Sequence, residues 1–171
     1  TADARVSSLL VAVFSVGVAI GSVVINAMLK GKVSAKYSPI SVIAMAVIVV
    51  IFSIEVRLWE PAAAGALYDF SSFILQRQAW IVIVTLTAVA ITGGMFVVPL
   101  YAFLTTTVTK DQTARTVAAN NIVNAGAMVF GSLFVLALSA AGIKSEDMLL
   151  VVAGMCLISA WIAQKLHRAC D

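Results

Sequence analysis

The sequence predicts an all-α integral membrane protein whose chain crosses the bilayer five times. Of its 171 residues, 62% are hydrophobic and only 11% carry a charge, whereas soluble domains are about 45–50% apolar and about 25% charged. A domain of this size leaves roughly 30% of the surface of its unfolded chain in contact with water, so it cannot bury that excess. Disorder is excluded as well, because a disordered chain combines low hydrophobicity with high net charge.

Five apolar stretches, each close to the length of about 20 residues that a spanning helix needs, account for this composition. Residues 47–51 are apolar without interruption, so the period-two alternation of a barrel strand is absent. The spans are expected to be helices, because backbone groups in a bilayer have no water to bond. They are residues 6–29, 39–59, 80–104, 116–141 and 148–166, in a transmembrane domain of residues 1–166 followed by a cytoplasmic tail of residues 167–171.

Basic residues in the connecting segments predict which way the spans point. Cytoplasmic loops of membrane proteins are enriched in Lys and Arg. One side of the predicted bundle has seven such residues, and the other has four, together with six of the eight acidic residues. The more basic side is expected to be cytoplasmic, which places the N-terminus outside and the C-terminus inside. The seven residues are Lys30, Lys32, Lys36, Lys110, Arg115, Lys165 and Arg168.

The first span contains two glycines, Gly17 and Gly21, four residues apart. Such a pair lets another helix approach closely in a membrane. Packing within the chain is the favoured interpretation, and dimerisation is the alternative. Ser22 and Asn26 lie on nearly the same stripe, where they either bond a neighbouring helix or line a cavity.

The second span has charges only near its end, at Glu55 and Arg57, and both are expected near the outer interface. In the loop that follows, residues 60–79, the sequence allows two interpretations. One is a short helix over Phe70–Leu75 that lies in the membrane interface, and the other is a plain external loop. The side chains expected to enter the headgroup region in the first case are Phe70, Phe73 and Ile74.

The third span contains Gly93, Gly94 and Pro99, residue types that weaken helical hydrogen bonding and permit kinks. Two interpretations remain open. The helix bends at this point as a transport cavity opens and closes, or it has a static kink that improves packing. Tyr101 is either a gate on the inner side or an interfacial tyrosine.

The fourth span contains three asparagines, Asn120, Asn121 and Asn124. Unpaired amides are costly in hydrocarbon, so these side chains are expected to face protein or water. Asn124 shares a helix face with both of the others, by spacings of four and three residues. The functional interpretation is a polar lining of a substrate pathway in the cytoplasmic half, and the structural one is hydrogen bonding between helices.

The sequence offers no chemistry for an enzyme, a cofactor or a metal. Intramembrane charges usually mark proton relays and ion sites, yet no charged residue or histidine falls near the middle of a span. Nucleophile–base arrangements, phosphate-binding loops and metal-ligand spacings are absent too. Cys156 is expected to be a packing residue. The net charge of +3 is not clustered as a nucleic-acid surface requires.

Two segments carry a resemblance to a known family. Residues 98–104 (VPLYAFL) and 115–124 (RTVAANNIVN) resemble the tenth and eleventh helices of bacterial lysophospholipid-transporter-like members of the major facilitator superfamily. These proteins often continue into a glycerophospholipid acyltransferase domain. The first loop, with Gly31, Lys32 and Lys36, resembles the second copy of the superfamily's cytoplasmic loop motif, although the motif's usual acidic residue is missing.

This resemblance implies that the five spans are helices eight to twelve, most of the C-terminal six-helix half of a major facilitator fold. It implies alternating-access transport of lysophospholipids or similar amphipaths across the bacterial inner membrane, with the N-terminus of the chain periplasmic. Membrane lipid, the substrate, the missing N-terminal half and a fused acyltransferase are the implied partners. Efflux of drugs or metabolites, a membrane anchor for the acyltransferase and a purely structural subunit are alternatives. Because the chain starts without methionine, we expect a fragment of a longer protein. With half of the central cavity missing, we expect that this fragment does not transport by itself.

Overall fold

A computed structural model describes residues 4–30, 34, 36–59 and 69–170. Within them the chain is helical and has no strand. Five of the helices are long and apolar enough to cross a membrane. The predicted all-helical chain, with five apolar helices of spanning length, is therefore confirmed. The elements are α1 (Ala4–Leu29), α2 (Ser38–Arg57), α3 (Phe70–Leu75), α4 (Arg77–Thr106), α5 (Lys110–Ala140) and α6 (Ser145–Cys170).

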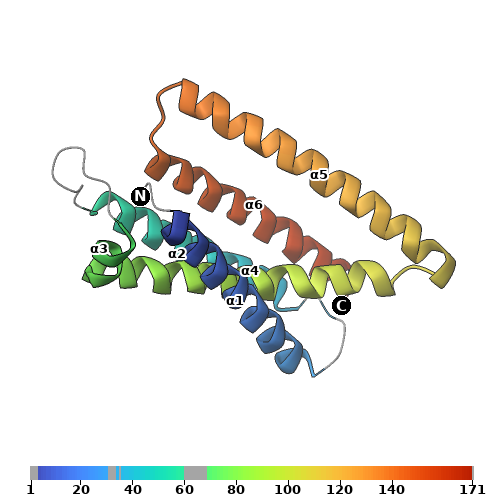
Figure 1. Ribbon diagram of the computed structural model, residues 1–171. Coiled ribbons are helices and arrows are strands. Elements are labelled where there is room, and N and C mark those ends of the chain that lie inside the picture. The colour runs from blue at the N-terminus through green and yellow to red at the C-terminus, as the bar shows by residue number, and fades with distance from the viewer. Residues whose placement is uncertain (1–3, 31–33, 35, 60–68, 171) are drawn as a thin grey trace.

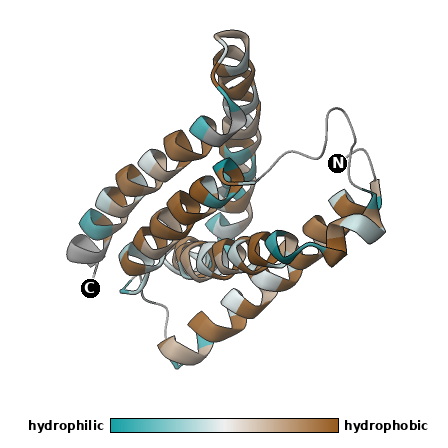
Figure 2. Cartoon of the chain, turned by 90° about the vertical axis from the view of Figure 1, so that its left-hand side faces the viewer, coloured by the Kyte–Doolittle hydropathy of each residue, from teal (hydrophilic) through white to brown (hydrophobic). Residues whose placement is uncertain are grey.

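The helices pack in the spatial order α1, α4, α2, α6, so that α4 and α2 lie in the middle. Helix α5 is different: it is spaced from its neighbours along most of its length (Figure 1) and buries none of its residues. Hydrophobic residues cover the long helices on their outward faces as well (Figure 2). Such all-round hydrophobicity is typical of membrane-spanning helices, because lipid replaces water around them.

Glycines bring α1 and α4 into close contact. A Cβ atom added to Gly17 would lie 2.6 Å from the Cβ of Ala90, and one added to Gly21 would lie 2.1 Å from the carbonyl oxygen of Ile91. From the other side, a Cβ on Gly94 would lie 2.6 Å from the carbonyl oxygen of Val18. The packing interpretation of the Gly17/Gly21 pair is therefore confirmed, and its partner is α4 of the same chain.

A second core joins α2 to α6. Val42 and Ala46 of α2 are buried against Cys156 and Ala160 of α6, and Phe96 of α4 packs on this cluster. Small residues again allow the helices to approach closely. The burial of Cys156, which is 6% exposed, confirms its predicted packing role.

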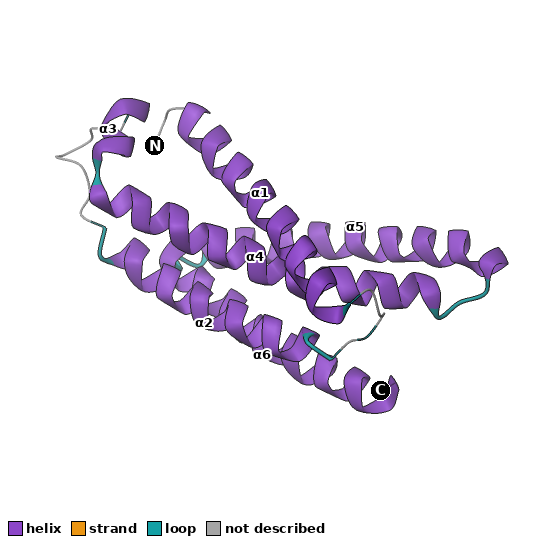
Figure 3. Ribbon diagram, turned by 90° about the horizontal axis from the view of Figure 1, so that it is seen from below, coloured by secondary structure: helices purple, strands orange, loops and turns teal. Residues whose placement is uncertain are grey.

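Short helix α3 closes one end of the bundle, which we call the α3 end (Figure 3). Its bounds match the sequence-predicted interfacial helix, so the plain-loop alternative is wrong for these residues. The carboxylate of Asp69 accepts a hydrogen bond of 3.2 Å from the backbone N–H of Ser72, as an N-cap does. One expectation is corrected: the side chain of Phe73 does not project out of the bundle but is buried against Val6 and Ala79.

The turn between α5 and α6 is fixed by Gly142, whose φ is +81°. The backbone N–H of Gly142 bonds the carbonyl oxygen of Ser139, and that of Ile143 bonds the carbonyl oxygen of Leu138. This is the Schellman pattern, which needs a left-handed residue just past the helix end. The turn reverses the chain so that α6 begins at the α3 end.

Candidate functional site

A cleft of about 410 Å³ lies between α4 and α5, far from the α3 end. It contains three of the polar residues that the sequence singled out, namely Tyr101 from α4 and Asn120 and Asn124 from α5. The remaining lining residues are all apolar: Val97, Leu100, Phe103, Leu104 and Leu166. The structure thus brings together residues from two separate segments of the sequence, along with the end of α6.

Helix geometry explains which asparagines reach the cleft. Asn120 and Asn124 are one turn apart and share a face of α5. Asn121 lies about 100° further round the helix, is exposed, and is absent from the lining. Helices α4 and α5 are antiparallel neighbours because only a short turn, containing Thr107 and Thr109, connects them.

The polar groups of the cleft are accessible. Asn120 is half-buried, Asn124 is exposed, and Tyr101 is 42% exposed. In the part of the chain that the structure describes, no hydrogen bond joins any of the three side chains to another residue. Each amide offers two N–H donors and a carbonyl acceptor, and the phenol both donates and accepts. An apolar cleft with a few polar groups fits a ligand that has a hydrogen-bonding head and an apolar body.

Other sequence-predicted residues lie elsewhere. Asn26 is exposed on α1, next to the buried Ile25, and does not line this cleft. Gly93 and Pro99 lie within the continuous helix α4. Proline lacks an N–H, so the carbonyl oxygen of Met95 loses its usual partner four residues on. The proposed bending of α4 at this segment stays a prediction.

Gly94 has a definite contact, whatever its role in bending. Its close approach to Val18 makes it a packing residue of the α1–α4 crossing. Gly93, by comparison, has only the sulfur of Met45 within 4 Å of an added Cβ, at 3.6 Å. Of the two glycines, Gly94 is therefore the one whose side chain must be absent for the helices to pack.

Of the three residues in the cytoplasmic loop motif, the structure describes only Lys36. Its side chain is exposed, with the Nζ atom 5.7 Å from the centre of the neighbouring Tyr37 ring, a cation–π arrangement. Its backbone N–H donates to the Oγ atom of Ser34 at 3.2 Å. The other two residues, Gly31 and Lys32, lie outside the described residues.

Two contacts at the α3 end were not anticipated from the sequence. The hydroxyl of Thr85 on α4 lies 2.6 Å from the Oε2 atom of Glu55 on α2, and the guanidinium of Arg57 forms an exposed ion pair with Asp147 of α6. The available signal was weak: Glu55 is the one acidic residue inside a predicted span, and such a residue in a membrane helix calls for a partner. The sequence alone does not identify Thr85 as that partner, because this requires knowing that α2 packs against α4.

The helical fold, with five helices long and apolar enough to span a bilayer, is that of a multi-pass membrane protein. Among the described residues, no group of three or more His, Cys, Asp or Glu side chains is placed to hold a metal ion. Comparison of the chain with family models, with curated proteins and with solved structures finds no match.

Proposed function

We propose that this chain belongs to a transporter that moves lysophospholipids, or amphipaths of similar shape, across the bacterial inner membrane by alternating access. The observation that carries the proposal is the cleft between α4 and α5. Its two amides and one phenol are set in an otherwise apolar wall. A lipid with one acyl chain needs such a combination, because its head requires hydrogen-bonding partners while its chain stays in apolar surroundings.

The residues behind the family resemblance support the same site. Leu100, Tyr101, Phe103 and Leu104 belong to the first resembling segment, and Asn120 and Asn124 belong to the second; all six line the cleft. The two segments that carry the family resemblance thus meet at a single place. The assignment of the five spans to a major facilitator fold, with the basic loops in the cytoplasm, is part of this proposal.

Helix α5 is suited to a moving part. It buries none of its residues, so few packing contacts oppose a change in its position. Elements that move in function come from the weakly packed part of a structure. In an alternating-access cycle, movement of α5 relative to α4 would open and close the cleft that lies between them.

Uptake of a lysophospholipid with a labelled headgroup, by cells that produce the full-length transporter to which this chain belongs, tests the proposal. Replacing both Asn120 and Asn124 by Leu removes two neutral hydrogen-bonding groups, each worth about 1 kcal/mol, so uptake should fall about tenfold or more. Asn121→Leu is the matched control, since Asn121 is on the same helix but outside the cleft, and it should keep near wild-type uptake. Unchanged uptake by a well-expressed double variant would refute the assignment of this cleft.

Competition experiments separate the lipid from other substrates. Unlabelled lysophospholipid should reduce the uptake signal in proportion to its concentration. If drug-like cations or small metabolites competed while lysophospholipids did not, the protein would be a facilitator of another substrate class, and the lipid assignment would be wrong.

A further inference from the structure

A carboxylate inside a membrane-spanning segment needs an explanation, and Glu55 is such a group. It lies in α2, two residues before the helix ends at Arg57, and it is half-buried. Ionisable groups in spans are costly and usually functional. The basic residue nearest to it in the sequence, Arg57, is not its partner, because Arg57 pairs with Asp147.

The protein satisfies Glu55 only in part. The hydroxyl of Thr85 lies 2.6 Å from its Oε2 atom, but that hydroxyl also contacts the carbonyl oxygen of Ile81 and has only one proton to donate. Among the described residues, no Lys, Arg or His forms an ion pair with Glu55. The carboxylate therefore retains sites that can accept a further hydrogen bond.

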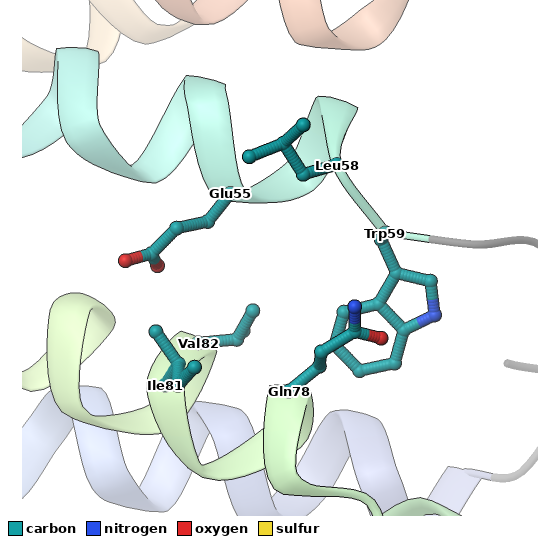
Figure 4. A pocket seen from close by; sticks show the side chains of 6 residues that line it. All are labelled: Glu55, Leu58, Trp59, Gln78, Ile81 and Val82. Atoms are coloured by element: carbon teal, nitrogen blue, oxygen red, sulfur yellow. The ribbon is translucent and has the colours of Figure 1, made fainter.

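Two hollows adjoin this carboxylate on the surface between α2 and α4. The smaller, about 160 Å³, is lined by Glu55, Trp59 and Gln78 among others. Figure 4 shows the carboxylate between the two helices, directed away from the side chains of Trp59 and Gln78. The larger, about 330 Å³, adds Arg77, Trp80 and Thr85 to the lining. Glu55 and Ile81 line both hollows, and we call the two together the Glu55 hollow.

The groups of the Glu55 hollow have complementary charges. Glu55 is an acceptor for an ammonium group, and the indole rings of Trp59 and Trp80 can attract a cation. Arg77 lines the larger hollow with Glu55, forms no ion pair within the described part of the chain, and is a residue type suited to phosphate. A ligand that carries an ammonium and a phosphate would satisfy both charged side chains at once.

The position in the bilayer fits such a ligand. The hollow lies where the spans end. Arg77 and Trp80 are in the first turn of α4, and Trp59, just past the end of α2, stacks on Phe73 with ring centres 6.0 Å apart. Tryptophans are favoured at the depth of the lipid headgroups. Outside the hollow, exposed apolar side chains such as Ile51 and Ile54 continue along α2, where acyl chains would lie.

We propose that the Glu55 hollow binds the zwitterionic headgroup of a bilayer phospholipid, with the ammonium at Glu55 and the phosphate at Arg77. This site is distinct from the cleft of the proposed function. Tyr101 is 24 residues beyond Arg77 on α4, which corresponds to roughly 35 Å along the helix. That distance is similar to the hydrocarbon thickness of about 30 Å, so the two sites are near opposite faces of the membrane.

Tryptophan fluorescence of the purified protein in maltoside micelles tests this site. The protein has three tryptophans, and Trp161→Phe leaves the two in the hollow as reporters. Dihexanoyl phosphatidylethanolamine and dihexanoyl phosphatidylglycerol differ only in the headgroup. We expect a saturable change with the ethanolamine lipid and at least tenfold weaker binding of the glycerol lipid. Equal binding of the two lipids by this protein would overturn the proposal without requiring any further variant.

Variants then locate the site. Glu55→Gln should weaken binding of the ethanolamine lipid about tenfold or more, as the loss of a charge-assisted hydrogen bond predicts, and Arg77→Gln should do the same. Asp111→Asn removes an exposed carboxylate in the first turn of α5 and is the control. Unaltered affinity in both hollow variants would contradict the proposal.

Free ethanolamine, added alone, should bind at least tenfold more weakly than the lipid. Binding as tight as that of the lipid would identify a small-amine site instead and would overturn the headgroup assignment.

These outcomes are independent of the proposed transport function. Headgroup binding at the α3 end can be lost without affecting the cleft at Asn120 and Asn124, and the reverse is also true. Loss of uptake in the Asn120/Asn124 variant with unchanged fluorescence titrations would support both assignments separately.

Discussion

Gly21 of α1 lies directly against Ile91 of α4: a Cβ atom on Gly21 would be 2.1 Å from the Ile91 carbonyl oxygen. Because that oxygen belongs to a helix backbone, it cannot move aside as a flexible side chain can. Together with Gly17 and Gly94, this contact fixes how α1 crosses α4. The crossing holds the first span to the middle of the bundle.

Gly21→Ala should therefore destabilise the protein by about 2 kcal/mol or more, as forced overpacking does. Gly126 is a matched control, because it is also helical and an added Cβ meets nothing within 4 Å. Gly126→Ala should instead be neutral or stabilising, by up to about 1 kcal/mol. Thermal unfolding in detergent, followed by circular dichroism, measures both. Equal effects of the two changes would contradict the close crossing of α1 and α4.

The ion pair between Arg57 and Asp147 connects α2 with α6 but should contribute little stability. The two side chains are 43% and 46% exposed, and exposed pairs typically contribute at most about 1 kcal/mol. A double-mutant cycle with Arg57→Gln and Asp147→Asn should give a coupling energy in that range. It should decrease further in 1 M salt, where the Debye length is about 3 Å. A coupling above 2 kcal/mol that salt leaves unchanged would show that water does not reach the pair.

The docking of α3 should depend on pH through Asp69. Hydrogen bonds from the side chain and then the backbone of Ser72 hold the pKa of Asp69 below its usual value of 3.8. A group whose pKa is lowered by folding stabilises the folded state above its unfolded pKa and loses this contribution as the pH falls through the folded pKa. The α3 cap should therefore be intact at neutral pH and weaken only below pH 3.8.

Fluorescence of Trp59, which stacks on Phe73 of α3, reports this change. Asn also caps helices well but does not titrate, so Asp69→Asn should retain the docked signal at acid pH. If the signal of Asp69→Asn followed the same acid transition as the wild type, another group would be responsible.

Features that depend on local sequence agree with the structure. Of the two interpretations left open for Phe70–Leu75, the short helix is the one that the structure shows, with the same bounds. The five spans were recognisable from hydropathy alone. Gly17 and Gly21 were correctly identified as packing residues, since their spacing places them on one face of a helix.

The failures have a common physical cause: they depend on which helices meet. Phe73 was expected in the headgroup region but is buried with Val6, a residue 67 positions earlier. The contact between Glu55 and Thr85 crosses two helices. Lipid makes no distinction between the faces of an apolar helix, so hydrophobic periodicity does not indicate helix pairing in a membrane as it does in water.

The cleft illustrates both situations. The clustering of Asn120 and Asn124 was evident from their spacing, whereas their meeting with Tyr101 required the antiparallel arrangement of α4 and α5. Asn121 seemed equivalent to its neighbours in the sequence, but the orientation of α5 places it outside the cleft. That distinction supplies the control used in the uptake experiment.

Photo-crosslinking shows directly whether an amphipath occupies the α4–α5 cleft. A benzophenone amino acid replaces Tyr101 in the cleft or, as control, Ile122, whose side chain is 73% exposed on α5. Membranes containing the protein are irradiated with a radiolabelled lysophospholipid. We expect labelling at position 101 that excess unlabelled lysophospholipid abolishes, and at position 122 only labelling that the competitor does not reduce. Labelling at position 101 that is as weak and as insensitive to competitor as at position 122 would contradict the proposed occupancy of the cleft.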